Sequence, residues 1–535
     1  MINKCLAAAL LCCCVAGHAQ SDFATASATP KGNRYDQALA GVYEKREQDW
    51  RNGAIVYQVL VDRFAPSADL DAKKHLYPAP KVLRRWDETP RRGSFVESEK
   101  LWSHEIEFWG GDLASLTAKL DHVQAMGADV LYLNPVHLAY TNHKYDALDY
   151  QQISPEFGNR NDVKLLAKNL HRRGIKLVLD GVFNHMGRHA PMFKQAEADP
   201  RSRWRDWFVF GPQYLSGARL WWQVPSLPEL NLENPRVRDS VYGRADSVVR
   251  SYLRDGVDGW RLDVAVDIGF QWLTELTRAA HAQKSGSLVV GEIANYPKEW
   301  IPSVDGVMNF TLREIILRSA AGQIDPAHAA RMIDRMVADA GPGQLLKSWI
   351  MLDNHDTARA ATLLPVENQR RLAQVLQFTL PGAPNIYYGS EVGMTGGDDP
   401  EMRAPMRWDW VREDNSTLSW TKKLVQLRKQ HRALRVGDYR PVTTHRLLAF
   451  ERHTDRAADT VVVITNPGSE PVSETVLMGN SKLMNNWDMI DALDGKTRVK
   501  IMASMLNISL PAHGVLVLTP ELSPGGGYSA YKRVQ

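Results

Sequence analysis

The sequence predicts an α/β protein: a (β/α)8 TIM barrel, a loop subdomain inserted after the third strand, and a C-terminal all-β domain. Two observations support this fold class. Eight short apolar runs rich in β-forming residues alternate with amphipathic stretches between residues 54 and 388. Polar groups then follow the ends of several runs. Alternating strands and helices are typical of a parallel sheet, and eight units indicate a closed barrel. An open doubly wound sheet is the alternative that alternation alone leaves.

Periodicity places the individual elements. Residues 113–126 and 162–173 have apolar side chains at three- and four-residue spacing, and a helix-ending glycine follows each, Gly127 and Gly174. The predicted strands are residues 54–61, 129–134, 175–179, 257–262, 287–290, 306–309, 348–352 and 384–388.

Composition changes mark the domain boundaries. The barrel domain is predicted over residues 51–435, and its segment 184–240, rich in Trp, Pro, Arg and Asn, is too long for one helix and forms the inserted subdomain. Residues 436–520 contain short alternating strands and are predicted as a β-sandwich. The Gly-rich residues 521–535 are predicted as a flexible tail.

The first 19 residues read as a signal peptide. Lys4 precedes an apolar run at residues 6–15, and Ala19 ends a small-residue segment suited to cleavage. A short buried helix and a lipid-anchored cysteine are the alternatives. All four cysteines, Cys5, Cys12, Cys13 and Cys14, lie in this segment. We therefore expect an exported protein, periplasmic or extracellular, without disulfides, in which residues 20–50 form a linker and a helix.

Charge and hydropathy exclude two classes of function. The formal net charge is +4, with basic and acidic residues interspersed along the 535-residue chain, so nothing points to a nucleic-acid partner. After the signal segment no apolar stretch reaches about 18 residues, so no membrane span is expected.

Acids, histidines and an arginine follow four predicted strands. The residues are Asp180, Asn184 and His185 after the third strand, Arg261 and Asp263 at the end of the fourth, Glu292 after the fifth, and Asp353, His355 and Asp356 after the seventh. Because active sites of parallel barrels form at the carboxyl ends of the strands, we expect these groups at one mouth.

Two of these acids suit glycosidic bond cleavage with retention, which needs a carboxylate nucleophile and a carboxylic acid about 5 Å apart. Neighbouring strands can hold Asp263 and Glu292 at that separation. Arg261 is expected to keep Asp263 ionised. Glu292 is long enough to reach the leaving oxygen, and Asp356 is then available to bind sugar hydroxyls.

Together these stretches resemble the α-amylase family of glycoside hydrolases. The resemblance runs from Tyr57-Gln-Val-Leu-Val-Asp62-Arg63-Phe64 to about Trp408. The family's four signature segments correspond, in order, to Asp180-Gly-Val-Phe-Asn184-His185, Gly259-Trp-Arg261-Leu-Asp263, Gly291-Glu292 and Asp353-Asn-His355-Asp356.

The resemblance implies a role for each matching residue. Asp263 is similar to the nucleophile, Glu292 to the acid/base and Asp356 to the transition-state stabiliser. Sugar-binding positions are matched by His143, Tyr145, His185, Arg261, His355, Asp399 and Arg403, of which Tyr145 corresponds to a tyrosine that stacks under the reacting sugar. Asp180 and Asn184 match supporting positions, Asp180 as a partner of Arg261.

One segment and one departure bear on the substrate. Residues 227–231 (Leu-Pro-Glu-Leu-Asn) resemble a fifth segment of the neopullulanase and cyclomaltodextrinase branch. Val266 and Asp267 stand where many α-amylases have Lys-His beside the leaving group, so the leaving-group subsites are not predicted. Trp221 and Trp222 are either sugar platforms or the core of the insertion. That branch usually carries an N-terminal β-domain that supports dimers; this chain has no room for one, so a monomer is expected.

Cofactor needs are small on this interpretation, because the carboxylates suffice for the chemistry. A structural calcium ion is a further hypothesis, with Asn184 at a family calcium position and Asp69, Asp71 and Asp112 as another set of oxygen ligands. Solvated loop acids are the alternative for these three.

The predicted function is hydrolysis of α-1,4-glucosidic bonds in starch, maltodextrins or cyclodextrins by double displacement. A glucan transferase or isomerase using the same site is the first alternative. A non-catalytic glucan-binding protein is the second, although all three carboxylates are present.

Overall fold

The structure is a computed structural model that describes residues 34–523 and 526–534. The predicted signal peptide with its four cysteines lies outside the described residues, as does the linker up to residue 33. Helix α1 (Arg34–Gln48) precedes the barrel.

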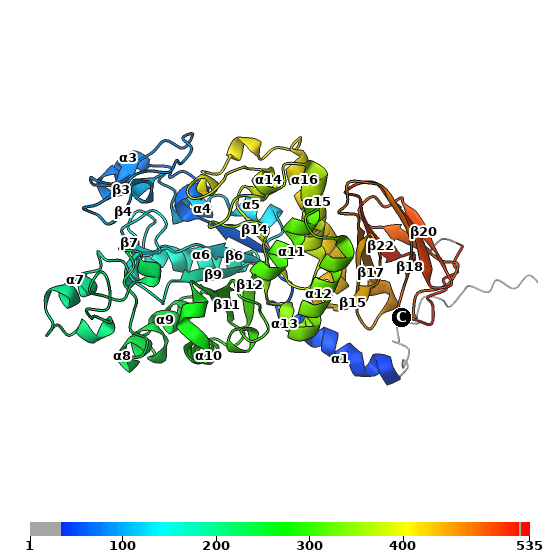
Figure 1. Cartoon of the computed structure of the whole chain (residues 1–535), viewed down its shortest axis with the longest axis horizontal. Helices are drawn as coiled ribbons and strands as arrows, with labels where there is room; N and C mark the ends of the chain where they lie inside the picture. Colours follow the sequence, from blue (N-terminus) through cyan, green and yellow to red (C-terminus); the bar gives the residue numbers. More distant parts are fainter. Residues whose placement is uncertain (1–33, 524–525, 535) are drawn as a thin grey trace, which may run out of the picture.

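Eight parallel strands close into a barrel, because β1 pairs with both β6 and β14 (Figure 1). The strands are β1 (Val56–Val59), β6 (Val130–Leu133), β9 (Lys176–Gly181), β10 (Gly259–Leu262), β11 (Leu288–Ile293), β12 (Gly306–Asn309), β13 (Trp349–Ile350) and β14 (Ala383–Tyr387). Each lies within or overlaps one of the predicted strands. Closure excludes the open doubly wound sheet and confirms the predicted barrel.

The barrel interior changes from apolar to polar along the strands. Side chains of a strand alternate in direction, so residues two apart face the same side. Val178 and Val290 belong to an apolar cluster of buried barrel residues. Two positions further along the same strands come Asp180 and Glu292. This alternation directs polar groups to the carboxyl mouth above an apolar floor.

Helices surround the barrel. They are α4 (Leu113–Thr117), α5 (Leu120–Ala125), α6 (Arg160–Arg172), α9 (Val248–Arg254), α10 (Ala265–Gln283), α11 (Phe310–Ala320), α12 (Pro326–Ala340), α13 (Pro342–Leu345), α14 (Ala360–Leu363), α15 (Glu367–Thr379), α16 (Ser416–Gln430) and α17 (Arg432–Val436). The single helix predicted over residues 113–126 is two short helices, because the chain leaves helical geometry at Lys119. Within residues 34–523 and 526–534, none of the helices combines the length and apolar character that crossing a membrane requires.

Two excursions extend the mouth of the barrel. The first follows β1 and was not predicted as a unit; it contains α2 (Val61–Phe64), α3 (Leu70–Lys73), η1 (Lys74–Leu76), β2 (Val82–Leu83), β3 (Phe95–Val96), β4 (Leu101–Trp102), η2 (Ser103–Ile106) and β5 (Glu107–Phe108). The second follows β9 where the insertion was predicted; it contains α7 (Pro191–Ala198), η3 (Arg205–Trp207), η4 (Trp221–Gln223), α8 (Pro235–Arg238) and η5 (Asp239–Gly243). In Figure 1 both lie at the end of the barrel away from the C-terminal sheet.

Shorter elements complete the mouth. A hairpin of β7 (His137–Ala139) and β8 (Ala147–Ile153) follows β6. Single turns follow the later strands: η6 (Ile301–Ser303), η7 (Ser390–Val392), η8 (Glu401–Arg403) and η9 (Trp408–Trp410).

The C-terminal domain, predicted as a β-sandwich, is an eight-stranded antiparallel sheet in the order β15-β16-β17-β22-β19-β20-β21-β18. Its elements are β15 (Asp438–Val442), β16 (Leu448–His453), η10 (Ala457–Asp459), β17 (Val461–Thr465), β18 (Val472–Leu477), β19 (Asp488–Asp491), β20 (Arg498–Met502), β21 (Met505–Leu510) and β22 (Val515–Pro520). One apolar cluster contains residues from β16 and β17 together with residues from β18 and β21 at the other end of the order.

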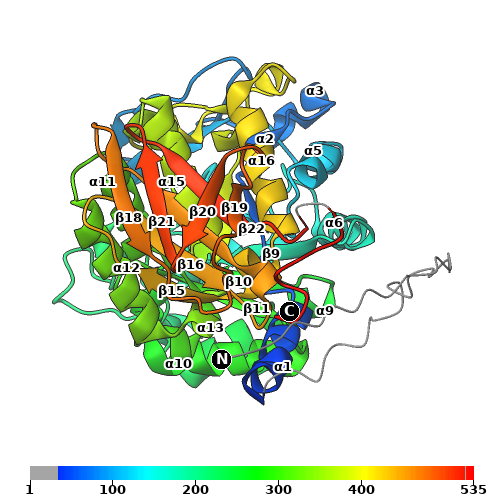
Figure 2. The ribbon, with the colours of Figure 1, turned by 90° about the vertical axis from the view of Figure 1, so that its right-hand side faces the viewer.

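A buried arginine of β16 fastens this domain to the barrel. Arg452 donates to the carbonyl of Thr379 at 2.7 Å. This carbonyl belongs to the last turn of α15, where helix acceptors lack helical partners. Figure 2 shows the sheet lying across the barrel with α1 beside it.

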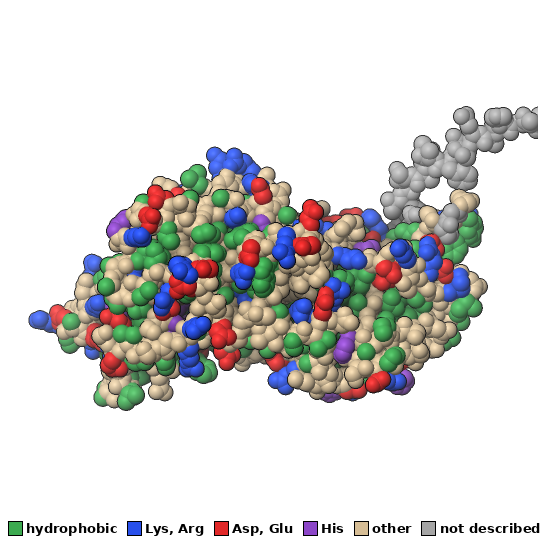
Figure 3. Space-filling model, turned by 90° about the horizontal axis from the view of Figure 1, so that it is seen from above, with side chains coloured by type: hydrophobic (Ala, Val, Ile, Leu, Met, Phe, Trp, Pro, Cys, Tyr) green, Lys and Arg blue, Asp and Glu red, His purple; other side chains and the backbone are tan. Residues whose placement is uncertain are grey.

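The tail predicted to be flexible packs against this sheet in part. Tyr531 is buried, its hydroxyl accepts a hydrogen bond from the Met484 amide at 3.2 Å, and its ring lies near Trp487. On the face in Figure 3, basic and acidic side chains are interspersed, as they are in the sequence.

Candidate active site

Strand register brings the two central carboxylates to one level. Leu262 of β10 is the partner of Gly291 of β11, so the next residues, Asp263 and Glu292, emerge side by side. A side chain at Gly259, the first residue of β10, would meet the Leu288 carbonyl oxygen at 2.4 Å, so glycine permits this close pairing. The predicted neighbouring positions of the two acids are therefore present.

A single buried guanidinium joins three carboxylates. Nη1 of Arg261 lies 2.9 Å from Oδ1 of Asp180 and 2.9 Å from Oδ1 of Asp263, and Nη2 lies 3.0 Å from Oε1 of Glu292. The Arg261 side chain is fully buried, whereas that of Glu292 keeps a fifth of its surface exposed. One positive charge is thus shared among three acids, and Glu292 is the one that faces the opening.

The single charge of Arg261 does not balance three carboxylates, so the expectation that Arg261 keeps Asp263 ionised needs correction. Burial raises the pKa of Asp263 well above its ordinary value; Arg261 opposes this, while Glu292, Asp180 and Asp356 add to it. Burial likewise raises the pKa of Asp180 to about 6, against Arg261 and two tyrosine hydroxyls. Bringing several like charges into a region of low polarity disfavours their full ionisation.

The residue after Asp263 orients Glu292. Val264 has φ 45° and ψ 45°, the left-handed conformation that a β-branched side chain rarely adopts. In this conformation its amide donates to Oε2 of Glu292 at 3.0 Å. Glu292 is therefore fixed from two sides, by this amide and by Arg261.

His185 completes the floor near Asp263. Its Nε2 lies 3.8 Å from Oδ2 of Asp263 and has no hydrogen-bond partner among the described residues. Burial lowers the pKa of His185 to about 3, so the ring is neutral at ordinary pH. Next to it, Asn184 is buried and its carbonyl accepts from the Leu230 amide at 2.9 Å, which ties the strand end to the insertion.

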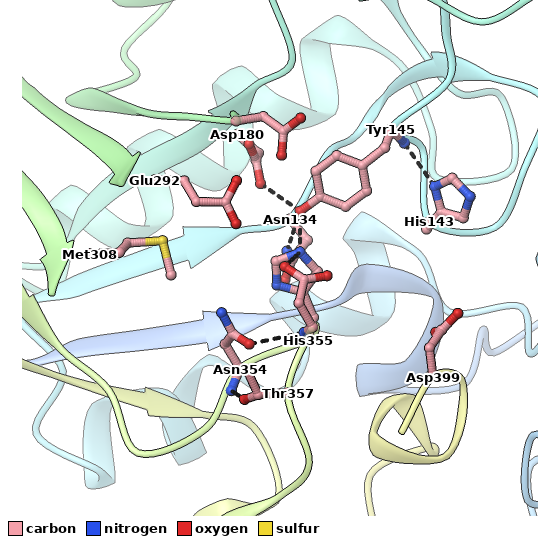
Figure 4. Close-up of polar contacts among 12 residues, drawn as sticks. Asn134, His143, Tyr145, Asp180, Glu292, Met308, Asn354, His355, Thr357 and Asp399 are labelled. Atoms are coloured by element: carbon pink, nitrogen blue, oxygen red, sulfur yellow. Dashed lines mark hydrogen bonds and ion pairs between the residues drawn. The ribbon is translucent and has the colours of Figure 1, made fainter. Parts of the chain in front are cut away.

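Tyr145 lies between Asp180 and His143 in Figure 4. Its hydroxyl donates to Oδ2 of Asp180 at 2.9 Å and receives a hydrogen bond from the Asn134 amide at 2.9 Å. Its backbone amide donates to Nδ1 of His143 at 3.1 Å, and the other nitrogen of that ring faces Glu105 at 3.1 Å. The tyrosine ring is thus fixed in position beside the carboxylates.

Hydrogen bonding assigns the tautomer of His355. The Gln58 side-chain amide donates to Nδ1 at 3.0 Å, so the proton is on Nε2. The Nε2–H donates to the Tyr145 hydroxyl at 2.5 Å, and Nε2 also lies 3.0 Å from Oδ2 of Asp356. The ring stacks on Tyr145 with centroids 5.3 Å apart. Burial, with Arg261 and Arg403 nearby, lowers the pKa of His355 well below its usual range, so the ring is neutral.

Arg403 links two acids, Asp356 and Asp399, and Figure 4 shows Asp399 across the site from Glu292. Its guanidinium lies 3.3 Å from Asp356 and 3.1 Å from Asp399, and Nε donates to the His355 carbonyl at 2.8 Å. Although burial acts in the other direction, Arg403 and His104 hold the pKa of Asp399 below its ordinary value. Asp356 keeps over a third of its side-chain surface exposed.

The acids considered for calcium have other partners. Asp69 and Asp112 cap α3 and α4, and Asp71 pairs with Lys74 at 2.7 Å. Lys73 also pairs with Asp112. The Asn184 side-chain amide lies 3.5 Å from Nδ1 of His185. The described part of the chain holds no cluster of three His, Cys, Asp or Glu side chains arranged for a metal ion.

The structure thus brings all twelve predicted site residues to one mouth. Sequence reasoning missed four polar or backbone groups: Gln58, Asn134 and His104, and the Val264 amide. Asn134 ends a predicted strand, so the rule that found Asp180 would have found it. Gln58 is a lone polar residue inside an apolar run, and the conformation of Val264 has no sequence signal.

Comparison with known proteins identifies the family. The model of the alpha amylase catalytic domain matches residues 58–437. A cyclomaltodextrinase from a Bacillus species is 33% identical over 435 residues, covering 78% of this chain and 73% of its own. Neopullulanase 2 from Thermoactinomyces vulgaris is 33% identical over 454 residues, covering 80% and 72%. The chain belongs to the alpha-amylase family of glycoside hydrolases.

Solved structures agree with this assignment. The cyclic alpha-maltosyl-(1→6)-maltose hydrolase from Arthrobacter globiformis superposes with a TM-score of 0.73 at 29% identity, covering 88% of this chain and all of its own. The type III pullulan hydrolase from Thermococcus kodakarensis gives a TM-score of 0.75 at 28% identity, covering 88% and 82%. The fold and enzyme class predicted from the sequence are confirmed.

Proposed function

We propose that this enzyme cleaves α-1,4-glucosidic bonds with retention of configuration, with Asp263 as nucleophile, Glu292 as acid/base and Asp356 as stabiliser of the charged sugar. The observation that supports this most strongly is the pair of carboxylates, Asp263 and Glu292, on the two terminal nitrogens of Arg261. Retention requires two such acids close together, and separate acids further apart would favour inversion.

The two steps follow from this arrangement. The Asp263 carboxylate attacks the anomeric carbon as the glycosidic C–O bond breaks, and Glu292 gives its proton to the leaving oxygen. Water then attacks the same carbon, Glu292 takes a proton from that water, and the bond to Asp263 breaks. The Val264 amide orients Glu292 for both steps.

Other residues hold the sugar. Tyr145 offers its ring face to the reacting sugar, and neutral His185 and His355 donate to hydroxyls near the carbon that becomes positively charged. Asp356 lies beside His355 and stabilises that charge. Asp399 and Arg403 bind the preceding sugar, since Asp399 lies across the site from Glu292, and therefore from the leaving group, and Arg403 pairs with Asp399.

Proton NMR of the first products tests the stereochemistry. Hydrolysis of maltotetraose should first release the α-anomer at the new reducing end, before mutarotation. First release of the β-anomer would refute retention. Asp263→Asn should bind maltotetraose without turning it over.

The names of the relatives support α-glucans as substrates: starch, maltodextrins or cyclodextrins. Product profiles on soluble starch and on β-cyclodextrin rank them. A glucan transferase using the same carboxylates is the alternative, favoured by the exposed aromatic ring of Trp222 near the mouth. Raising the acceptor concentration separates the two, since a hydrolase continues to form mainly hydrolysis products.

We also propose export to the periplasm or exterior, on the character of residues 1–19, and action as a monomer. Fractionation of cells that produce the full chain, with the N-terminal sequence of the product, tests the first. Light scattering tests the second.

A further inference from the structure

We propose that Trp221 and Trp222 of η4, together with Asp267, form the platform that binds the sugar on the leaving-group side and positions acceptors there. This rests on the proposed function and identifies the subsite that the sequence left open at Val266 and Asp267. The ligand class is an α-linked glucose or maltose unit.

The His185 ring lies between Trp221 and the nucleophile, Asp263. Its indole stacks on His185 with ring centroids 5.4 Å apart and planes inclined by 25°. The other edge of that histidine faces Asp263, with Nε2 3.8 Å from Oδ2. The two indoles therefore adjoin the part of the site that binds the reacting sugar.

A chain of contacts places the pair on the side of the acid/base. Nε1 of Trp221 donates to Oδ2 of Asp267 at 3.1 Å. Asp267 is in the first turn of α10, three residues after Val264, whose amide binds Glu292. Glu292 protonates the leaving oxygen, so the sugar attached to that oxygen lies beside this turn. Asp399, by contrast, lies across the site from Glu292 (Figure 4), and Arg403 pairs with it at 3.1 Å.

Trp222 is presented to solvent by a strained turn. It is 83% exposed, and both it (φ 46°) and Gln223 (φ 59°) are in the left-handed region that non-glycine residues avoid. The turn is nevertheless fixed, since the Trp221 amide donates to the Leu227 carbonyl at 3.0 Å and the Val224 amide donates to the Trp221 carbonyl at 2.8 Å. Strain kept in a fixed turn that exposes a large apolar ring indicates selection for binding rather than for packing.

The chemistry of the surface suits a sugar. The two indoles are 6.3 Å apart and inclined by 47°, so they form an angled wall rather than one flat sheet. Indole faces pack against the apolar faces of sugar rings, and the second carboxylate oxygen of Asp267 is available for hydroxyls. A sugar bound at this wall is therefore favoured as the leaving group, and as an acceptor it competes better with water.

The test uses α-maltosyl fluoride, because fluoride leaves without occupying a sugar subsite. Maltose is added as acceptor, and hydrolysis and transfer products are separated by chromatography. Trp222→Ala should need roughly tenfold more maltose than the wild type for the same share of transfer, a change of about 1.4 kcal/mol. It should lose a similar factor in kcat/KM on maltotetraose.

Two further variants make the result specific. Trp222→Phe keeps a ring and should restore most of the acceptor dependence. Tyr528→Ala removes another exposed ring, in the C-terminal segment, and should behave as wild type. The inference is overturned if Trp222→Ala partitions between water and maltose as the wild type does and keeps its kcat/KM on maltotetraose. Absence of fluoride release from the wild type would instead refute the proposed function.

Discussion

Two buried charge clusters lie at the same mouth and differ in balance. Arg261 faces three carboxylates, and the pKa of Asp263 and of Asp180 is raised. Lys144 faces one acid, Glu156, with both side chains buried, and its ammonium lies 5.0 Å from the centres of two phenylalanine rings. Although burial opposes it, Lys144 and Lys81 lower the pKa of Glu156.

The two clusters therefore have different roles: the balanced Lys144–Glu156 pair supports the structure, and the unbalanced Arg261 cluster carries the reaction. A balanced pair is satisfied by its own partner and serves to fix the chain; here Lys144 lies between His143 and Tyr145 and anchors the loop that presents them. An unbalanced cluster keeps carboxylates whose charge is not fully compensated, which is the state a nucleophile and a proton donor require. Functional groups are therefore expected where buried charges are unequal.

Removing the central acid gives the largest effect. Asp263→Asn should lower kcat on maltotetraose by about 10⁴-fold or more, the scale seen when a nucleophile is removed. Its unfolding temperature should be unchanged or higher, since one of three competing carboxylates is gone. A decrease in kcat of less than a hundredfold would show that another residue is the nucleophile.

Breaking the balanced pair should act on stability instead. Lys144→Met leaves Glu156 buried without its partner, a change that costs about 3–5 kcal/mol. Urea unfolding measures it. The matched control is Lys74→Met, which removes the lysine of an exposed pair with Asp71 and should cost at most about 1 kcal/mol. Equal effects of the two variants would show that the buried pair has no special role.

The raised pKa of Asp263 predicts the acid limb of activity. Below that pKa the carboxyl is protonated and cannot attack, so kcat/KM for α-maltosyl fluoride should fall about tenfold per pH unit. The fall should begin above about pH 4, the range of an ordinary aspartate. Return to pH 7 should restore the rate, which separates protonation from unfolding. Full activity at pH 4 would contradict the charge imbalance.

His137 is a buried histidine that belongs to neither cluster. Neither ring nitrogen of His137 has a hydrogen-bond partner among the described residues, and burial with Arg160 nearby lowers its pKa to about 3. The His137 ring packs against the rings of Tyr150, Tyr252 and Trp260.

Because the folded pKa of His137 is below the unfolded value near 6.5, its contribution to stability is present above pH 6.5 and is lost as pH falls towards 3. His137→Phe should reduce the loss of unfolding free energy between pH 6.5 and 4 by up to about 1.4 kcal/mol per pH unit. Urea unfolding across this range is the measurement. An unchanged pH dependence would mean that this ring does not titrate on unfolding.

The fold and the main acids could be predicted because they depend on local patterns. Alternation by two along β9 and β11 sends Asp180 and Glu292 to the same mouth, and strand ends are visible in the sequence. Contacts that depend on distant segments were not predictable: Lys144 with Glu156 across a hairpin, or Trp221 with Asp267 across the insertion. The strained geometry of Val264 is imposed by packing around the site, since valine itself disfavours it.

Trapping the covalent intermediate tests the central claim most directly. Glu292→Gln cannot assist the attack of water, but it still allows fluoride to leave. Incubation with α-maltosyl fluoride followed by mass spectrometry of proteolytic peptides should show one added maltosyl group on the peptide that contains Asp263. A maltosyl group on another residue, or β-maltose released with no adduct, would contradict the assignment of Asp263 as nucleophile.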